Sequence, residues 1–137
     1  MVSSPFAGIT ILERASFIAG PYCAKLLGDL GARVVKIEAP DFGDPARGFG
    51  PFPGDVPDRD QSGLFLFLAT NKQSITLDPA LPAGRDLFTR LVSGADVLVE
   101  DACPGTAEPL GLDYATLRQV NPRLICVSIT PYGQDGP

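Results

Sequence analysis

Two turns near the amino terminus hold the residues best placed to bind a ligand. The first, at Gly20 and Pro21, follows the apolar run Ile9 to Leu12, and the second, residues 39–47 (APDFGDPAR), follows the apolar run Val34 to Ile37. If both runs are neighbouring parallel strands, the two turns lie at one edge of the sheet, where open α/β folds bind their ligands. The sequence therefore predicts a binding site at that edge.

Several kinds of chemistry are excluded by what the sequence lacks. It contains no histidine, so this chain can form neither a Ser-His-Asp or Cys-His mechanism nor a histidine metal site. Cys23, Cys103 and Cys126 have no metal-like spacing, and their odd number argues against a disulfide framework. We expect Cys23 and Cys126 to be core residues, Cys103 to be an exposed and inert thiol, and no metal to be bound.

The charge and hydropathy of the chain restrict its partners. A net charge of −5 argues against nucleic acid, so a phosphate-bearing ligand must be held locally, by backbone N–H groups or by the few lysines and arginines. No apolar run approaches the roughly 20 residues that a membrane span needs, and no secretory signal is visible. We therefore expect no nucleic-acid or membrane partner and a cytoplasmic location.

Turn signals and apolar periodicity predict that strands and helices alternate along the chain. Pro21 suits a first helical residue, Gly31 ends that helix, and Ser62 and Asp113 suit the capping positions of later helices. The predicted strands are Ile9–Leu12, Val34–Ile37, Ser74–Leu77, Val97–Val99 and Leu124–Ile129; the predicted helices are Pro21–Leu30, a short one at 62–68, Pro82–Val92 and 113–120; residues 39–60 form a long loop. This order indicates an α/β domain with an open, doubly wound, mostly parallel, Rossmann-like sheet.

Two packing expectations follow from the first of these segments. The first helix is expected to bury Leu26 and Leu27 and to expose Lys25 and Asp29, because Cys23, Leu26, Leu27 and Leu30 fall on one helical face. Leu27→Ala would then cost ~2–5 kcal/mol. Lys36 and Glu38 alternate on an otherwise apolar strand, and we expect a structural ion pair or a loop anchor there.

The 137 residues suit one domain, but the chain ends at Pro137, in a loop directly after a strand. A sheet face normally needs a further helix to cover it. We therefore expect the domain to be incomplete at the carboxyl end, as a fragment or a split subunit, and to expose an apolar sheet face or pair with another chain.

The same segments resemble a known family, colinearly and over nearly the whole chain. Ala19-Gly20-Pro21, residues 27–32 (LGDLGA), residues 35–38 (VKIE), and Gly43-Asp44 with Arg47 match the amino-terminal signature of the family III CoA-transferases, typified by formyl-CoA and carnitine CoA-transferases. Later matches are residues 71–78 (NKQSITLD), 95–100 (ADVLVE), 104–105 (PG), 110–112 (LGL), 121–125 (NPRLI) and 132–137 (YGQDGP).

The resemblance implies an acyl-CoA:carboxylate CoA-transferase, or a related acyl-CoA racemase or isomerase, that uses coenzyme A and no metal. In the family an aspartate attacks the acyl-CoA thioester, and it lies beyond the last residue of this chain. No catalytic residue is therefore assigned here, and the isolated chain is expected to be inactive. Members form interlocked dimers with a second domain and a returning carboxyl-terminal segment, so the resemblance also implies a homo- or heterodimer and a partner segment that supplies the rest of the fold. The aspartates of this chain that do not match the nucleophile's motif are Asp41, Asp44, Asp55, Asp58, Asp60 and Asp101.

The resemblance also places CoA contacts on several turns of this chain. Lys72 is the foremost of them, because a lysine at a turn can meet a phosphate, although a solvated turn lysine explains it almost equally well without the family match. Members often carry Arg at the position of Ala39, Asn-Phe at Asp101-Ala102, and a basic residue near Pro109, and each lost charged contact matters by ~1.5–3 kcal/mol. The implied set is Ile18, Ala19, Ala39, Ala69, Thr70, Asn71, Lys72, Asp101, Ala102, Cys103 and Pro109.

Two other functions stay open from the residues alone. The chain fits a non-catalytic partner or regulatory domain that keeps the fold with degenerate CoA contacts, as Ala39, Asp101 and Pro109 suggest. A generic nucleotide-binding domain is disfavoured, because the glycines around the first helix do not form the G-x-G-x-x-G pattern.

Overall fold

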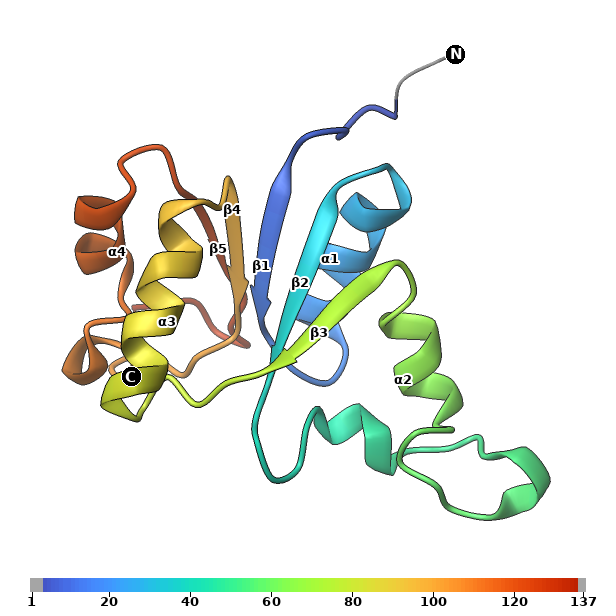
Figure 1. The fold of residues 1–137 in the computed structure, drawn as a ribbon. Coiled ribbons are helices and arrows are strands. Elements are labelled where there is room, and N and C mark those ends of the chain that lie inside the picture. The colour runs from blue at the N-terminus through green and yellow to red at the C-terminus, as the bar shows by residue number, and fades with distance from the viewer. Residues whose placement is uncertain (1–3, 136–137) are drawn as a thin grey trace.

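Five parallel strands form a single sheet in the computed structural model, which describes residues 4–135 (Figure 1). The strand order is β3-β2-β1-β4-β5, so the chain winds outward from β1 first in one direction and then in the other. This topology confirms the predicted open, doubly wound α/β fold. The strands are β1 (Thr10–Arg14), β2 (Arg33–Glu38), β3 (Lys72–Thr76), β4 (Val97–Glu100) and β5 (Ile125–Ser128).

Helices cover both faces of the sheet. Helix α1 (Ala19–Asp29) and the short helix α2 (Gly63–Leu68) lie on one side, and α3 (Pro82–Ser93) and α4 (Tyr114–Val120) lie on the other (Figure 1). Alternate residues of each strand therefore enter different cores. The core under α3 and α4 includes Leu12, Val35, Ile37, Phe88, Val92, Leu98 and Leu117, and the core under α1 includes Ile11, Ala24, Val34 and Val99.

Local sequence signals fix most of the element boundaries. The side chain of Ser62 accepts a hydrogen bond from the backbone N–H of Phe65, and Asp113 accepts one from Thr116, so both predicted caps are confirmed. The third strand begins at Lys72, two residues before the predicted start. The expected long loop after β2 contains two short 3-10 helices, Pro45–Gly48 and Pro53–Asp55.

Helix α1 approaches the sheet through its small residues, which corrects the predicted packing face. Gly20, Ala24 and Gly28 are buried and recur every four residues along one stripe. A Cβ atom at Gly28 would lie 3.2 Å from a methyl carbon of Val34, tighter than nearly all ordinary contacts. Because this stripe sets a close helix–sheet distance, the larger residues face outward, and the expectation that Leu26 is buried is wrong: 47% of it is exposed.

Lys25 departs from its prediction in the opposite sense. It is buried, because its ammonium group pairs with Asp29 at 2.5 Å and lies 5.1 Å from the centre of the Phe67 ring. Asp29 is exposed, as expected, while Leu27 is only half-buried at the margin of the core and Leu30 is exposed. The prediction of a helix was therefore correct, but the helix buries the face that carries its small residues and not the face that carries its leucines.

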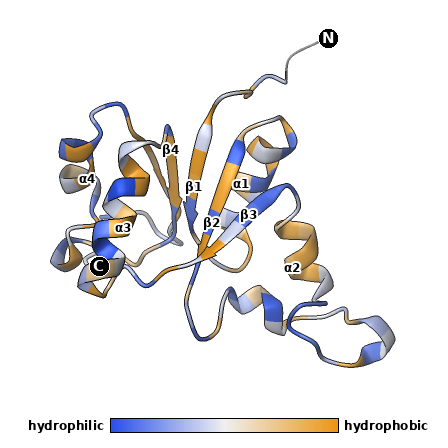
Figure 2. Ribbon diagram, viewed as in Figure 1, coloured by the Kyte–Doolittle hydropathy of each residue, from blue (hydrophilic) through white to orange (hydrophobic). Residues whose placement is uncertain are grey.

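The outward residues of α1 and α2 form an apolar surface. Ile18, Tyr22, Leu26 and Leu30 recur every four residues along α1, and the Tyr22 ring stacks on Phe67 of α2 with 6.4 Å between ring centres. Figure 2 shows α2 as a largely hydrophobic helix on the outside of the sheet. Part of the exposed apolar surface thus lies on a helical layer, and Ile125 of the edge strand β5 is also exposed; the expectation that the chain exposes a sheet face or pairs with another chain stays a prediction. Among residues 4–135, no helix is long and apolar enough to cross a membrane.

Candidate functional site

Three charged residues from adjacent strands meet beneath α1. Glu13 of β1 stands opposite Lys36 of β2 in the parallel register, and Lys72 begins β3. The Lys36 ammonium lies 2.7 Å from Glu13 Oε1, and the Lys72 ammonium lies 2.6 Å from Glu13 Oε2. All three side chains are at most 2% exposed. The centre of this face is therefore a buried chain of opposite charges inside an otherwise apolar layer.

Asp44 extends this chain of charges into the loop after β2. One carboxylate oxygen of Asp44 lies 2.6 Å from the Lys36 ammonium. The other accepts hydrogen bonds from the backbone N–H groups of Phe17 at 3.1 Å and Ala46 at 2.7 Å. Burial alone would lower the pKa of Lys36, but the carboxylates of Glu13 and Asp44 outweigh burial and raise that pKa. Asp44 therefore ties the turn after β1, at Phe17, to the loop after β2; Gly20 and Pro21, where the sequence placed the first turn, lie inside α1.

A second ion pair fixes the same loop. Arg47 binds Glu38 through two parallel hydrogen bonds, 2.7 Å from Nε to Oε2 and 2.9 Å from an Nη to Oε1, and the guanidinium carbon lies 3.7 Å from the centre of the Phe65 ring. The expectation of an ion pair or loop anchor at Lys36 and Glu38 is confirmed, with different partners for each. Burial would raise the pKa of Glu38, but hydrogen bonds from Arg47, Ser74 and the backbone of Asp44 lower it to about 2.

The depressed pKa of Glu38 predicts a pH-dependent stability. The unfolded carboxyl titrates near 4.5 and the folded one near 2, so the folded state binds fewer protons and Glu38 contributes its stability fully above pH 4.5. That contribution, about 3 kcal/mol at most for such a shift, is lost as pH falls from about 5 toward 2. We expect Glu38→Gln to be less stable than the wild type at pH 7 and nearly as stable at pH 2. Urea titrations of both proteins across this range measure the difference, and a constant difference would contradict the assignment.

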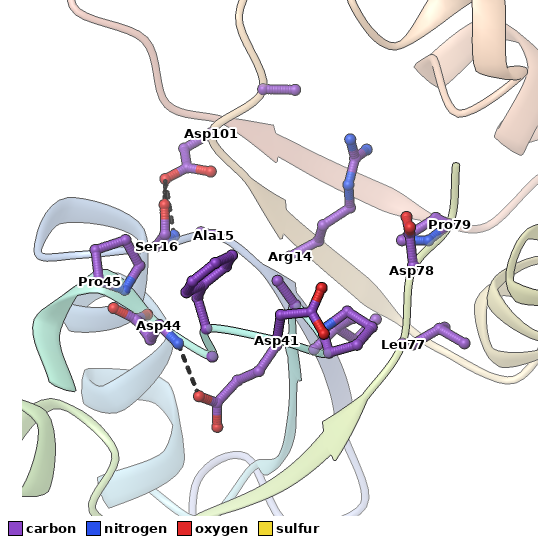
Figure 3. Close-up of a pocket in the computed structure, with 17 residues that line it drawn as sticks. Arg14, Ala15, Ser16, Asp41, Asp44, Pro45, Leu77, Asp78, Pro79 and Asp101 are labelled. Carbon is purple, nitrogen blue, oxygen red and sulfur yellow. Dashed lines mark hydrogen bonds between the residues drawn. The ribbon is translucent and has the colours of Figure 1, made fainter. Parts of the chain in front are cut away.

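A cavity of about 570 Å³ opens at the carboxyl edge of the sheet (Figure 3). It lies where the loops after β1, β2 and β4 converge, beside the segment that follows β3. Asp101 closes one side, because its carboxylate accepts hydrogen bonds from the backbone N–H of Ser16 at 2.8 Å and from the Ser16 hydroxyl at 3.1 Å. The predicted location of a binding site at this edge thus coincides with a cavity.

The structure brings only part of the implied CoA set to this cavity. Ala39, Asp101 and Ala102 line it. Cys103 lies in an adjacent cavity of about 430 Å³ that Ala102 also borders, and Pro109 is exposed in a 3-10 helix, Glu108–Leu110. Ile18 and Ala19 are exposed at the start of α1. The set is therefore spread over several turns at this edge.

The remaining implied contacts lie toward the opposite edge. Ala69, Thr70 and Asn71 precede β3, and the amide of Asn71 donates to Asp29 at 2.8 Å. Lys72 points inward: its ammonium donates to the backbone carbonyl of Pro21 at 2.7 Å and pairs with Glu13. Burial lowers the pKa of Lys72, and Glu13 only partly offsets this effect. The inward placement gives Lys72 a structural ion pair, and its contact with a CoA phosphate stays a prediction.

Sequence reasoning overlooked Arg14, which also lines the cavity. The signal was a second charged residue, after Glu13, at the end of the apolar run Ile9 to Leu12. Cys103 is exposed, as expected, while Cys23 and Cys126, which were expected in the core, are half-buried beside the two cores; burial raises the pKa of the Cys126 thiol to about 11. Within residues 4–135 there is no group of three or more Cys, Asp and Glu side chains arranged to hold a metal ion.

A doubly wound sheet with its cavity at the carboxyl edge defines a class of ligand-binding α/β proteins, and comparison with known proteins gives the family. The profile of CoA-transferase family III matches residues 6–137, and the chain belongs to that family. CoA-transferases act on CoA thioesters. The expected resemblance is thereby confirmed.

The relatives and solved structures agree with this family. The chain is 43% identical to the beta subunit of succinyl-CoA–L-malate CoA-transferase from Chloroflexus aurantiacus and 41% identical to acetyl-CoA:oxalate CoA-transferase from Acetobacter aceti. Each alignment covers 97% of this chain, but 32% and 33% of the relative. A CaiB/BaiF family protein from Brucella suis superposes with a TM-score of 0.88 at 38% identity, over 99% of this chain and 36% of that one. The chain thus spans about a third of the length of these relatives.

Proposed function

We propose that this chain forms the amino-terminal α/β part of an acyl-CoA:carboxylate CoA-transferase and supplies one wall of its CoA site. The observation that carries the proposal is the cavity at the carboxyl edge, lined by Ala39, Asp101 and Ala102, in a member of CoA-transferase family III. Asp44, which joins the turns after β1 and β2, holds that wall in place. The acid that accepts CoA is a small carboxylic acid, in keeping with the malate and oxalate enzymes among the relatives.

The isolated chain is expected to bind CoA weakly at most and not to transfer it. None of its carboxylates has been assigned as the nucleophile, and the two most buried, Glu13 and Asp44, are paired with lysines. Incubation with succinyl-CoA and labelled malate, oxalate or glutarate, followed by mass spectrometry, tests this expectation. Label in the CoA thioester would refute it if substituting one of the chain's own carboxylates, such as Asp41, abolished the transfer.

We further propose that another polypeptide segment covers the outer face of α1 and α2. The support is the apolar surface of Tyr22, Leu26, Leu30 and Phe67, since exposed patches of this kind usually mark an interface. Two C. aurantiacus relatives are named as alpha and beta subunits of one enzyme. Sedimentation at micromolar concentration should show self-association, which Leu26→Glu weakens and Leu87→Glu, an equally exposed leucine of α3, does not. A monomer at every concentration would contradict self-association.

A non-catalytic partner or regulatory role is the second candidate function. The cavity that would hold CoA is lined by the carboxylates of Glu38, Asp41, Asp44, Asp78 and Asp101, and such an excess of negative charge opposes phosphate binding. Failure of the wild-type chain to bind CoA at millimolar concentration by calorimetry would favour this second role over the first.

A further inference from the structure

Arg14 occupies a distinctive place in the sheet. It is the last residue of β1 and stands opposite Glu100, the last residue of β4, in the parallel register. β1 and β4 are the strands between which the winding direction of this sheet reverses. Ligands of open α/β sheets bind in the crevice beyond the carboxyl ends of the strands at such a reversal. Arg14 therefore projects from the position where the fold itself favours a ligand.

Arg14 is the single cationic side chain among the described residues that line the cavity. Its guanidinium carbon lies 6.0 Å from the centre of the Phe88 ring, and Figure 3 shows it beside Asp78, Pro79 and Asp101 at the cavity. The apolar side chains of Ile37, Leu77 and Pro79 contribute to the same wall. The site thus combines one positive group with apolar surface and with the five carboxylates named above.

Within residues 4–135 the Arg14 guanidinium makes no hydrogen bond and no ion pair, although it lies over the Phe88 ring. One of its terminal nitrogens is shielded from solvent and makes no hydrogen bond, and no carboxylate lies within 4.0 Å of the side chain. By contrast, Lys36, Lys72 and Arg47 are all paired. Among the carboxylates of the cavity, Asp101 is occupied by Ser16 and Asp44 by Lys36.

The Arg14 side chain pairs with no carboxylate of residues 4–135, and a planar fork of N–H groups matches the oxygens of a phosphate or carboxylate. We propose that Arg14 binds an anionic oxygen group of the ligand in this cavity, and that this group is a phosphate of CoA. The anion contact stands on the geometry of Arg14, while the identity of the ligand rests on the proposed function. A cavity of about 570 Å³ is the size of a site for a nucleotide-like group and far exceeds a small dicarboxylate.

Calorimetric titration of CoA into the wild type, Arg14→Gln and Arg14→Lys tests the proposal. We expect Arg14→Gln to weaken CoA binding about 10- to 100-fold, the effect of losing a hydrogen bond to a charged group, and Arg14→Lys to weaken it less. Arg90→Gln, which removes an exposed arginine from the last turn of α3, is the matched control and should bind like the wild type. Unchanged affinity in Arg14→Gln would overturn the proposal.

Two further titrants separate the possible sources of the anion. Dephospho-CoA, which lacks the 3′-phosphate, should lose the dependence on Arg14 if that phosphate is the one bound and retain it if the diphosphate is. Succinate binding that depends on Arg14, together with CoA binding that does not, would overturn the phosphate assignment. If the wild-type chain bound succinate or pyrophosphate through Arg14 but did not bind CoA, the proposed function would be refuted. The proposal that Arg14 binds an anion would still hold. Absence of binding for all of these anions would overturn both.

A measurement on the wild type tests the proposal even if the Arg14 variants fail to fold. The side-chain Nε–H resonance of Arg14 should shift on addition of CoA, while that of Arg90 should stay unchanged. A stationary Arg14 resonance at saturating CoA would overturn the proposal without any substitution.

Discussion

Replacing Lys36 with Met is expected to lower the free energy of unfolding by about 3–5 kcal/mol. The substitution removes the cation that lies 2.7 Å from Glu13 and 2.6 Å from Asp44 and leaves these carboxylates buried with less compensation. It also removes the hydrogen bond that the Lys36 ammonium donates to the carbonyl of Ala15 at 3.0 Å. Guanidinium titrations with a fixed slope measure the loss.

The matched control is Arg33→Met, at the first residue of the same strand. Arg33 is exposed, and its side chain donates to Gln73, so its loss should change stability by about 0.5 kcal/mol or less. If Lys36→Met lowered the free energy of unfolding no more than the control does, water would have to reach Glu13 and Asp44. The buried charges would then not stabilise the turns at the sheet edge.

Phe88→Ala is expected to lower the free energy of unfolding by about 3–5 kcal/mol, because transfer and cavity terms add at a site with no room to collapse. Phe88 is 0% exposed and joins α3 to the core that Leu12, Val35 and Leu98 form on that face of the sheet. The neighbouring Leu87 is 48% exposed.

Leu87→Ala is therefore the control for this helix, with an expected loss below about 1 kcal/mol. Thermal unfolding followed by circular dichroism compares the two variants in one experiment. Equal losses at the two positions would show that α3 contacts the sheet through a different face, in the same way that α1 differs from its predicted face.

The element order and the caps were predictable because their causes are local. Ser62 and Asp113 bond to backbone groups three residues away, and such contacts depend on a few neighbouring positions. The alternation of short apolar runs with helical periods was enough to indicate a parallel, doubly wound sheet. The buried face of α1 was not predictable from apolar period, because Gly20, Ala24 and Gly28 contact the sheet by virtue of their small size.

The candidate site, too, was predictable only where its causes are local in the sequence. The sequence by itself determined the edge of the sheet at which the cavity opens, because parallel strands place the turns after Leu12 and Ile37 side by side. Its order of motifs indicated the family. Only the tertiary structure decided the pairing of the charges. Glu13 and Lys36 are 23 residues apart in the chain and Lys72 lies still further on, so their contacts depend on strand register and on burial beneath α1. For the same reason Lys72, the foremost predicted phosphate contact, points inward, and Arg14 is the cation left facing the cavity.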